Sequence, residues 1–549
     1  MTTSLVLDIH FLKEAICQDL STRDIRRCML VCRAWHTNLS PYLWRDITLR
    51  RKHTLKRFNL PETQSILERY AQNVRVVNNI FADIWPIFCQ HPIHNLTVLR
   101  SPAVRRQNWT SKISNNYNHN IIALLDANPN LHTLELGHFS NAPETLEDLL
   151  EAIQNHNSLQ RVRIDHPRAA LSSPLFGLVL LACLKLQSIY INIRVHGTYG
   201  QMEPTRYTFL RLASLLDKAS PTTTLKELHF PGKIYPGDHY VFMGILALCP
   251  GLEQLTLPKM CFFNATPMLA STIATMPQLQ HLNVRSANVP FIHLVAMIQA
   301  CAGLTTFIAG DSPRSDHAEW TMVTELLHHH DTLEVLDLTG SGATGVTGAM
   351  MHALLCAVPN LKEFVAMGPV VMERKHGCYG DPFLRVSDME GVQEGSAWLC
   401  CRLRVLRLRF ENMDLCEGDM TVPEEAQEDQ NVRPAQLRIV PRVLVDQLSR
   451  LTSLEDLRLG RVLARNDQSG DQPMPVGHSL TGITSHRTNQ ESQALLQDKA
   501  RTLSMALESM SSLQRLKRLE LRNLKEYLDK PCLRNSRKQW KEIEWIQYS

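Results

Sequence analysis

A repeated pattern of apolar residues, L-x-x-L-x-L with conservative replacements, recurs along most of the chain. Its most regular units begin at Leu131, Leu159, Leu186, Leu225, Leu252, Leu279, Leu304, Leu333 and Leu361. Successive steps are 28, 27, 39, 27, 27, 25, 29 and 28 residues, and the one long step contains an insertion over residues 196–204. This period predicts stacked units, each with a short strand that turns its leucines inward and a return of roughly 20 residues.

The return segments are expected to be helices. Apolar residues recur in them at helical spacing, as at Leu146, Leu149, Leu150 and Ile153. Proline stands two residues before the first leucine of four units, where a helix must stop: Pro129, Pro250, Pro277 and Pro359. One unit cannot bury its own apolar face, so the units must stack. The pattern therefore predicts an α/β array of short parallel strands and helices rather than chance leucine spacing in an ordinary α/β domain.

The array is less regular at both ends. Weaker units begin at Val74 and Ile93, and later units begin at Leu403, Leu454 and Leu516. The later steps lengthen to 42, 51 and 62 residues, and polar stretches over residues 368–396, 411–429 and 465–493 are expected to be insertions. The stretch 411–429 carries eight acidic residues and no basic one.

The first 49 residues carry a different pattern. Ile9, Leu12, Ile16 and Leu20 form one apolar stripe at helical spacing, and a second apolar block runs from Ile25 to Trp35. Ser21 and Asp24 lie three residues apart between the blocks, which suits a helix N-cap. We expect a helical hairpin with a short hook at Tyr42 to Trp44. So short a segment has little core of its own.

These residues resemble the F-box family. The matches are Leu20-Ser21 and Asp24-Ile25 in the middle of the family pattern, the signature pentad Val31-Cys32-Arg33-Ala34-Trp35, and Leu43-Trp44 at its end. Leu7-Asp8 stands where the family has Leu-Pro, so the proline that pre-sets the first helix is absent. The repeat array resembles the leucine-rich-repeat family, which commonly follows an F-box in fungal and plant proteins.

The F-box resemblance implies that the hairpin docks on an adaptor of the Skp family, and through it on a cullin scaffold and a ubiquitin-conjugating enzyme. Such docking places apolar anchors of a helix into a groove. By motif match, the adaptor-binding residues are Ile9, Leu12, Ile16, Leu20, Ile25, Val31, Trp35, Leu43 and Trp44. The alternative is that these residues serve the core of the hairpin itself.

A second binding surface is expected on the strands of the array. The residue between the last two leucines of each unit should point outward, as should the outward positions that flank these leucines. Basic residues gather at these positions in the C-terminal units: Arg407, Arg409, Arg458, Arg518 and Arg522. An arginine-lined surface suits an acidic or phosphorylated protein substrate. The alternative is a solvated face with scattered charge, neutralised by the acidic stretch 411–429.

Composition and motifs narrow the class of protein. A net charge of +4 over 549 residues predicts no nucleic-acid partner, and no apolar run is long enough to span a membrane. The scattered cysteines and the lack of a signal peptide indicate a cytoplasmic or nuclear protein. No nucleotide, serine-hydrolase or zinc-protease motif appears, so we expect no enzyme activity and no cofactor.

Two possible metal motifs have simpler explanations. Cys28, Cys32 and His36 are spaced for one helix face but lack a fourth ligand, and closed zinc sites have four. The run His328-His329-His330 diverges around its helix, and histidines near a helix C-terminus favourably meet the helix dipole. We expect no metal.

The sequence therefore predicts four segments: an F-box-like helical domain at 1–50, a linker and irregular repeats at 51–130, regular leucine-rich repeats at 131–410, and C-terminal repeats with insertions and a basic tail at 411–549. The resemblance implies a non-catalytic substrate receptor of a cullin-based ubiquitin ligase. The alternative is a leucine-rich-repeat scaffold or inhibitor whose hairpin caps the first repeat. Nucleic-acid binding by the basic tail is the least favoured possibility.

Overall fold

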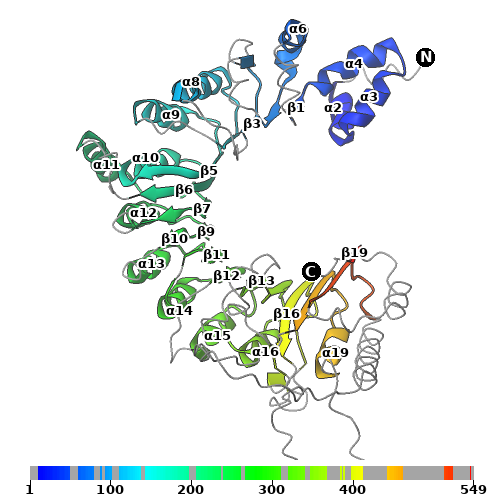
Figure 1. The fold of residues 1–549 in the computed structure, drawn as a ribbon, viewed down its shortest axis with the longest axis vertical. Helices are drawn as coiled ribbons and strands as arrows, with labels where there is room; N and C mark the ends of the chain where they lie inside the picture. The colour runs from blue at the N-terminus through cyan, green and yellow to red at the C-terminus, as the bar shows by residue number, and fades with distance from the viewer. Residues whose placement is uncertain are drawn as a thin grey trace, which may run out of the picture. The chain divides into compact units, whose positions relative to one another are not determined.

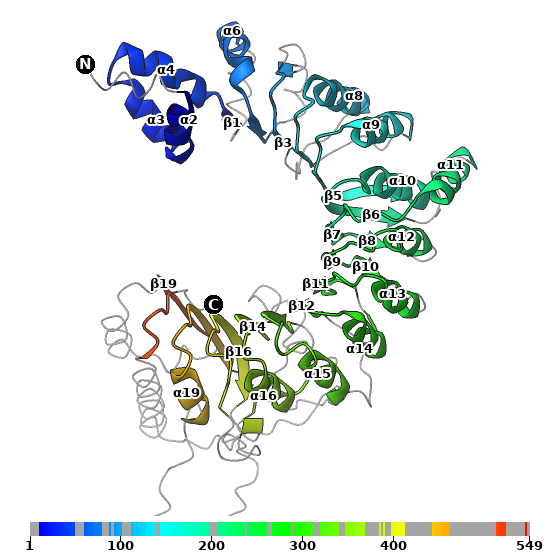
Figure 2. The same ribbon diagram turned by 180° about the vertical axis from the view of Figure 1, so that it is seen from behind.

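The repeats fold as the sequence predicts, into short strands that alternate with helices, in the computed structural model of the chain (Figures 1 and 2). The chain divides into two compact units, Met1–Gln278 and Leu279–Ser549. The structure describes residues 10–49, 60–79, 87–88, 93–101, 111–137, 143–196, 206–235, 239–260, 266–287, 289–310, 319–339, 346–367, 384–385, 388–389, 397–411, 442–461, 512–522 and 544–545.

Three helices begin the first unit: α2 (His10–Asp19), α3 (Thr22–Met29) and α4 (Arg33–Leu43). Ser21 caps α3, because its hydroxyl oxygen accepts a hydrogen bond from the backbone nitrogen of Asp24 at 3.2 Å, as the spacing predicts. The second apolar block was expected to form one helix, and this was wrong. The chain leaves α3 after Met29 and re-enters a helix after Cys32, whose backbone is extended.

The end of α4 also differs from the expectation. Pro41 lies inside α4, which continues to Leu43. Only Tyr42 and Leu43 follow Pro41 in this helix. The residues expected to form a separate hook therefore complete α4 and its C-cap at Trp44.

The strands of the first unit form a parallel sheet in chain order. They are β1 (Asp46–Thr48), β2 (Val76–Asn78), β3 (Val98–Ser101), β4 (Thr133–Leu136), β5 (Arg161–Ser172), β6 (Ser188–His196), β7 (Glu227–His229) and β9 (Gln254–Thr256). Two short strands, β8 (Lys233–Ile234) and β10 (Lys259–Met260), extend the sheet beside the second half of β6. One buried apolar residue per strand lies in register across the sheet: Ile47, Val77, Leu99, Leu134, Val162, Ile189, Leu228 and Leu255.

Helices cover one face of this sheet (Figure 1). They are α6 (Pro61–Tyr70) with the 3₁₀ turn η1 (Ala71–Asn73), α8 (Ser111–Ala127), α9 (Pro143–Asn155), α10 (Ser173–Cys183), α11 (Arg206–Lys218), α12 (His239–Leu246) and α13 (Thr266–Ile273). The opposite face of the sheet carries polar residues, and we call it the open face.

The second unit repeats this arrangement. Its parallel strands are β11 (His281–Asn283), β12 (Thr306–Ile308), β13 (Val335–Asp337), β14 (Glu363–Val365), β16 (Val405–Glu411), β17 (Asp456–Arg461), β18 (Arg518–Arg522) and β19 (Glu544–Trp545), with β15 (Leu384–Arg385) beside the end of β16. The helices are α14 (Phe291–Ala300), α15 (Glu319–Leu327), α16 (Gly348–Ala357) and α19 (Arg442–Ser449). An in-register ladder of fully buried residues again forms the core: Leu282, Phe307, Leu336, Phe364, Leu406, Leu457 and Leu519.

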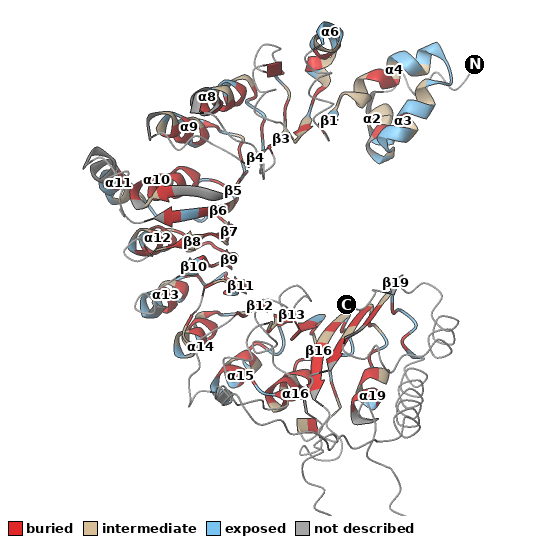
Figure 3. Cartoon of the chain, viewed as in Figure 1, coloured by how far each residue is buried: buried red, intermediate tan, exposed pale blue. Residues whose placement is uncertain are grey.

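The burial pattern confirms the predicted α/β leucine-rich-repeat array. Buried residues lie between strands and helices in each unit (Figure 3), and the predicted return helices are α9, α11, α14 and α16. Each helix that precedes a repeat proline ends before it, as α8 does at Ala127, two residues ahead of Pro129. Most of the predicted insertions at 368–396, 411–429 and 465–493 lie outside the described residues. None of the described helices is both long enough and apolar enough to cross a membrane.

Candidate protein-binding sites

The helical hairpin has a small core of its own. Cys17, Ile25 and Leu39 are buried in it, and these partly buried residues pack against them: Leu20, Cys28, Met29, Trp35, Tyr42 and Leu43. Burial of the Cys17 thiol raises its pKa, as expected for a small apolar side chain in a core. Among the predicted adaptor-binding residues, Ile25 therefore holds the hairpin together, while Leu12, Leu20, Trp35 and Leu43 are half-buried.

Three large apolar side chains among the described residues of the hairpin are exposed. Leu30 is 85% exposed and Val31 66% exposed at the turn between α3 and α4, and Ile16 on α2 is 40% exposed. Val31 and Ile16 were predicted to bind the adaptor, and Leu30 was not. Leu30 was missed because it lies next to the break between α3 and α4, and the sequence pattern did not show that break. Ile9 lies outside the described residues.

The half-buried Trp44 has a partner within the chain. Its ring stacks on Tyr70 of α6, with ring centroids 5.7 Å apart and an interplanar angle of 3°. The Tyr70 hydroxyl also contacts the hydroxyl of Ser40 on α4 at 3.5 Å. Strand β1 follows directly and pairs with β2, so the hairpin leads without interruption into the first repeat.

The cysteines and histidine suspected of metal binding do not share a helix. Cys28 lies on α3 and packs in the hairpin core, whereas Cys32 is the residue before α4 and His36 lies in that helix. Within the described ranges, no group of three His, Cys, Asp or Glu residues is placed to hold a metal ion.

The three consecutive histidines have separate partners. His329 is buried, accepts a hydrogen bond from the backbone nitrogen of Leu304 at Nδ1 (3.3 Å), and lies with Nε2 3.2 Å from the carbonyl oxygen of Ile298. His328 contacts Glu325 and His330 contacts Asp331. The buried histidine thus joins two neighbouring repeats.

The open face of the first unit carries a polar network. Arg100 donates to Glu135 at 3.0 Å, and Arg163 donates to Asp165 at 3.0 Å while its guanidinium lies 4.0 Å from the centre of the Tyr190 ring. Burial raises the pKa of Tyr190, and the charge of Asp165 raises it further. Arginine and acid are therefore matched along this part of the face.

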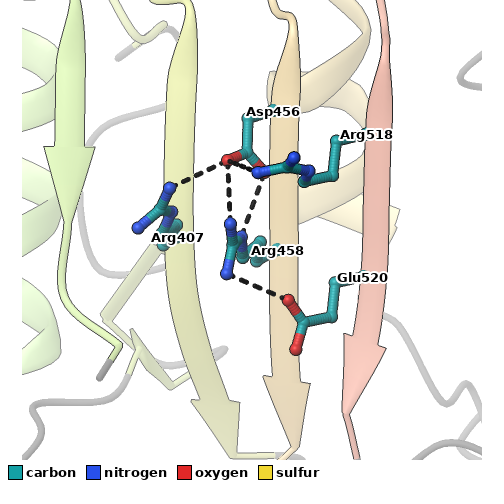
Figure 4. Close-up of polar contacts among 5 residues, drawn as sticks. All are labelled: Arg407, Asp456, Arg458, Arg518 and Glu520. Atoms are coloured by element: carbon teal, nitrogen blue, oxygen red, sulfur yellow. Dashed lines mark hydrogen bonds and ion pairs between the residues drawn. The ribbon is translucent and has the colours of Figure 1, made fainter. Parts of the chain in front are cut away.

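The C-terminal arginines surround one acidic residue (Figure 4). Arg407 donates to Asp456 Oδ2 at 2.9 Å, and Arg458 reaches both carboxylate oxygens at 3.1 and 3.2 Å. Arg518 approaches Asp456 at 3.9 Å, and Arg458 also pairs with Glu520 at 3.2 Å. Three of the five predicted substrate-binding arginines are thus brought together, but around Asp456 of β17 and Glu520 of β18, which the predicted surface left out.

The other two predicted arginines are placed differently. Arg409 is buried, with 4% of its surface exposed, beside Gly460 of β17. Arg522 lies on β18, but its side chain is outside what the structure describes. The substrate contacts of these arginines stay a prediction.

A cysteine and a histidine lie close together on α16. The Trp398 indole donates to His352 Nδ1 at 3.1 Å, and Cys356 Sγ lies 3.6 Å from His352 Nε2. Because Nδ1 accepts a hydrogen bond, the neutral ring carries its proton on Nε2. It therefore cannot take a proton from the thiol, as a catalytic base for cysteine would.

Other thiols are also unsuited to nucleophilic chemistry. Burial raises the pKa of Cys183, Cys249, Cys301 and Cys400 to about 12. A thiol with so high a pKa is inert near neutral pH. These cysteines act as small apolar residues of the repeat core.

Comparison with known proteins agrees with this description of the N-terminal helices. Residues 12–50 match the F-box-like family. No curated protein sequence matches the chain. Among solved structures, that of an internalin, InlF from Listeria monocytogenes str. 4b F2365, is similar with a TM-score of 0.31 and 14% identity, over 62% of this chain and 76% of that one. The chain thus combines an F-box-like N-terminal region with a leucine-rich-repeat array.

Proposed function

We propose that this protein is the substrate-recognition subunit of a cullin-based ubiquitin ligase. The F-box-like hairpin binds a Skp-family adaptor, and the repeats bind the target protein. The observation that carries the proposal is the exposure of Leu30 and Val31 in a region whose core is closed without them. Adjacent exposed apolar residues in an F-box-like hairpin suit burial against a partner.

The proposed mechanism is proximity. The chain supplies two binding surfaces and performs no chemistry itself. Binding the target and the ligase through one chain makes their encounter effectively intramolecular, and this raises the concentration of target lysines near the conjugating enzyme.

The test is capture of a Skp-family adaptor and a cullin by the purified full-length chain. A Leu30→Asp/Val31→Asp variant should lose at least about a hundredfold in adaptor affinity, because two apolar anchors are replaced by charges that must be desolvated. Its circular dichroism should match that of wild type, since both side chains are exposed. This choice is sharper than substituting Leu20 or Trp35, which pack on the hairpin core.

The matched control is Leu60→Asp/Ile66→Asp. These two apolar residues are also exposed, but they lie at α6, outside the F-box-like region. The control should bind the adaptor as wild type does. Equal binding by both double variants would show that the turn between α3 and α4 is not the docking site.

A second candidate function is a repeat scaffold whose hairpin is only an N-terminal cap. The stacking of Trp44 on Tyr70 and the pairing of β1 with β2 favour it, because both tie the hairpin to the first repeat. Failure of the folded wild-type chain to capture any Skp-family adaptor would support the cap and remove the ligase assignment.

A further inference from the structure

Three basic residues lie side by side on the open face of the first unit. Arg194 of β6 pairs in register with Lys233 of β8, and Lys233 pairs in register with Lys259 of β10. Neighbouring strands lie about 4.8 Å apart, so the three charges span about 10 Å. We call Arg194, Lys233 and Lys259 the basic row.

The side of the sheet follows from the alternation of side chains along a strand. Ile193 and Val195, on either side of Arg194, are buried, and so is Ile234 after Lys233. The basic side chains therefore project from the opposite, open face.

The backbone holds these strands close together. A Cβ atom added to Gly232 would lie 2.1 Å from the carbonyl oxygen of Ile193, so only glycine allows this approach of β8 to β6. On its other side, the carbonyl oxygen of Gly232 accepts a hydrogen bond from the backbone nitrogen of Lys259 at 2.7 Å. The in-register placement of the three basic residues is thus built into the strands.

Two of the three charges of the basic row, those of Arg194 and Lys259, have no side-chain partner among the residues that the structure describes. Arg194 and Lys259 are exposed, and within the described part of the chain their side chains make no hydrogen bond or ion pair. Lys233 places its ammonium group 4.1 Å from the centre of the Tyr235 ring. Elsewhere on the same face the arginines have acids, as Arg100 has Glu135 and Arg163 has Asp165.

Like charges at facing positions of neighbouring strands destabilise a sheet. A negatively charged partner would relieve this repulsion. The nearest acid along β5 and β6, Asp165, is already held by Arg163 at 3.0 Å and by the side-chain amide of Asn192 at 2.9 Å. Arg194 and Lys259, whose side chains have no partner among the described residues, are therefore placed to bind an external ligand.

We propose that the basic row docks an acidic peptide segment of the target protein, through carboxylates that lie across β6, β8 and β10. In an extended segment, every second side chain points the same way at a spacing of about 7 Å, so two carboxylates fit the length of the row. This inference rests on the proposed receptor function. It places the site for an acidic target in the first unit, whereas the C-terminal arginines predicted for that role pair with acids of the chain itself.

The test is fluorescence polarisation with the full-length chain and a labelled peptide of alternating glutamate and glycine. The matched probe replaces glutamate by glutamine. Wild type should bind the acidic peptide and not the neutral one, with affinity falling as salt increases. The Arg194→Ala/Lys259→Ala variant should bind roughly fivefold more weakly or worse, as expected for two exposed ion pairs.

Two controls separate charge from fold. The Arg69→Ala/Lys218→Ala variant removes the same charge from exposed positions on α6 and α11, and should bind as wild type does. The Arg194→Ala/Lys259→Ala variant should melt at the same temperature as wild type or higher, because it removes repulsion between like charges. If these residues had a structural role, the substitutions would lower the melting temperature instead.

The outcomes are decisive in either direction. No binding of the acidic peptide by wild type, or equal weakening by both double variants, would overturn the proposal. So would binding of a single-stranded RNA of equal charge with the same dependence on the row. Adaptor capture should be unchanged in the Arg194→Ala/Lys259→Ala variant, so a failure here is distinct from a failure of the receptor assignment.

Discussion

Arg458 holds Asp456, two residues earlier on the same strand, through both carboxylate oxygens at 3.1 and 3.2 Å. The carboxylate of Asp456 is nearly buried and also takes the charge of Arg407. One acid therefore holds together the open face of β16, β17 and β18.

Removing that acid should destabilise the second unit. Asp456→Asn removes the carboxylate charge that Arg407, Arg458 and Arg518 share. Because the arginines are partly exposed, we expect a cost of about 2–3 kcal/mol, below that of a fully buried pair. Urea denaturation measures the change. Asp331→Asn, at an exposed side-chain contact with His330 in the same unit, should cost under about 1 kcal/mol, and an equal loss in both variants would contradict this account.

A buried asparagine should be essential to the stacking of the first repeats. Asn128 Oδ1 accepts from the backbone nitrogen of Leu96 at 2.8 Å, and its amide donates to the carbonyl oxygen of Leu124 at 2.8 Å. Asn128→Ala leaves both backbone groups unsatisfied and should cost about 2–4 kcal/mol in thermal or urea unfolding. The exposed neighbour Asn130→Ala is the matched control and should change little.

The stacking of Trp44 on Tyr70 should control how firmly the hairpin joins the repeats. Trp44→Ala removes an aromatic pair worth about 1 kcal/mol beyond its buried area. We expect faster amide exchange at Val76 and Asn78 of β2, measured by hydrogen–deuterium exchange, with strands β6 and β7 unaffected. Unchanged exchange in β2 would mean that the stack does not support the first strand pair.

The stability of the second unit should depend on pH through His352. Burial lowers the pKa of His352, although the charge of Asp388 opposes the shift. At this histidine the unfolded chain then binds a proton more readily than the folded one. The contribution of neutral His352 to the free energy of unfolding is therefore complete above about pH 6.5, and it falls as the pH drops through the folded-state pKa. The wild-type melting temperature should decrease from pH 7.5 to pH 5.5, and His352→Phe should reduce that slope. The exposed His330→Phe should keep it.

Periodic positions made much of the fold predictable. Leucines at a constant step specify strands that must stack, because each repeat buries its apolar side only against its neighbours. The F-box-like hairpin was visible from Val31 to Trp35, because a signature pentad is a local pattern. Ser21 and Asp24 marked the start of α3 for the same reason, since a cap involves residues only three apart.

Other features could not be read from local patterns. Leu30 was placed in a helical block, and only the break before Cys32 exposes it. The predicted arginine surface omitted Asp456, because it gathered basic residues alone, although this acid lies in register with Arg518. The role of Trp44 depends on Tyr70, which lies 26 positions further along the chain.

The sequence by itself determined the repeat array, its strand and helix positions and the F-box-like hairpin, because these depend on local patterns and on a constant step between repeats. The tertiary structure alone decided which charges meet. Arg194, Lys233 and Lys259 lie far apart in the chain and outside the leucine motif, and they become neighbours only because β8 and β10 pair beyond the repeat strands. Electrostatic interaction depends on distance in space, and pairing register rather than sequence sets that distance.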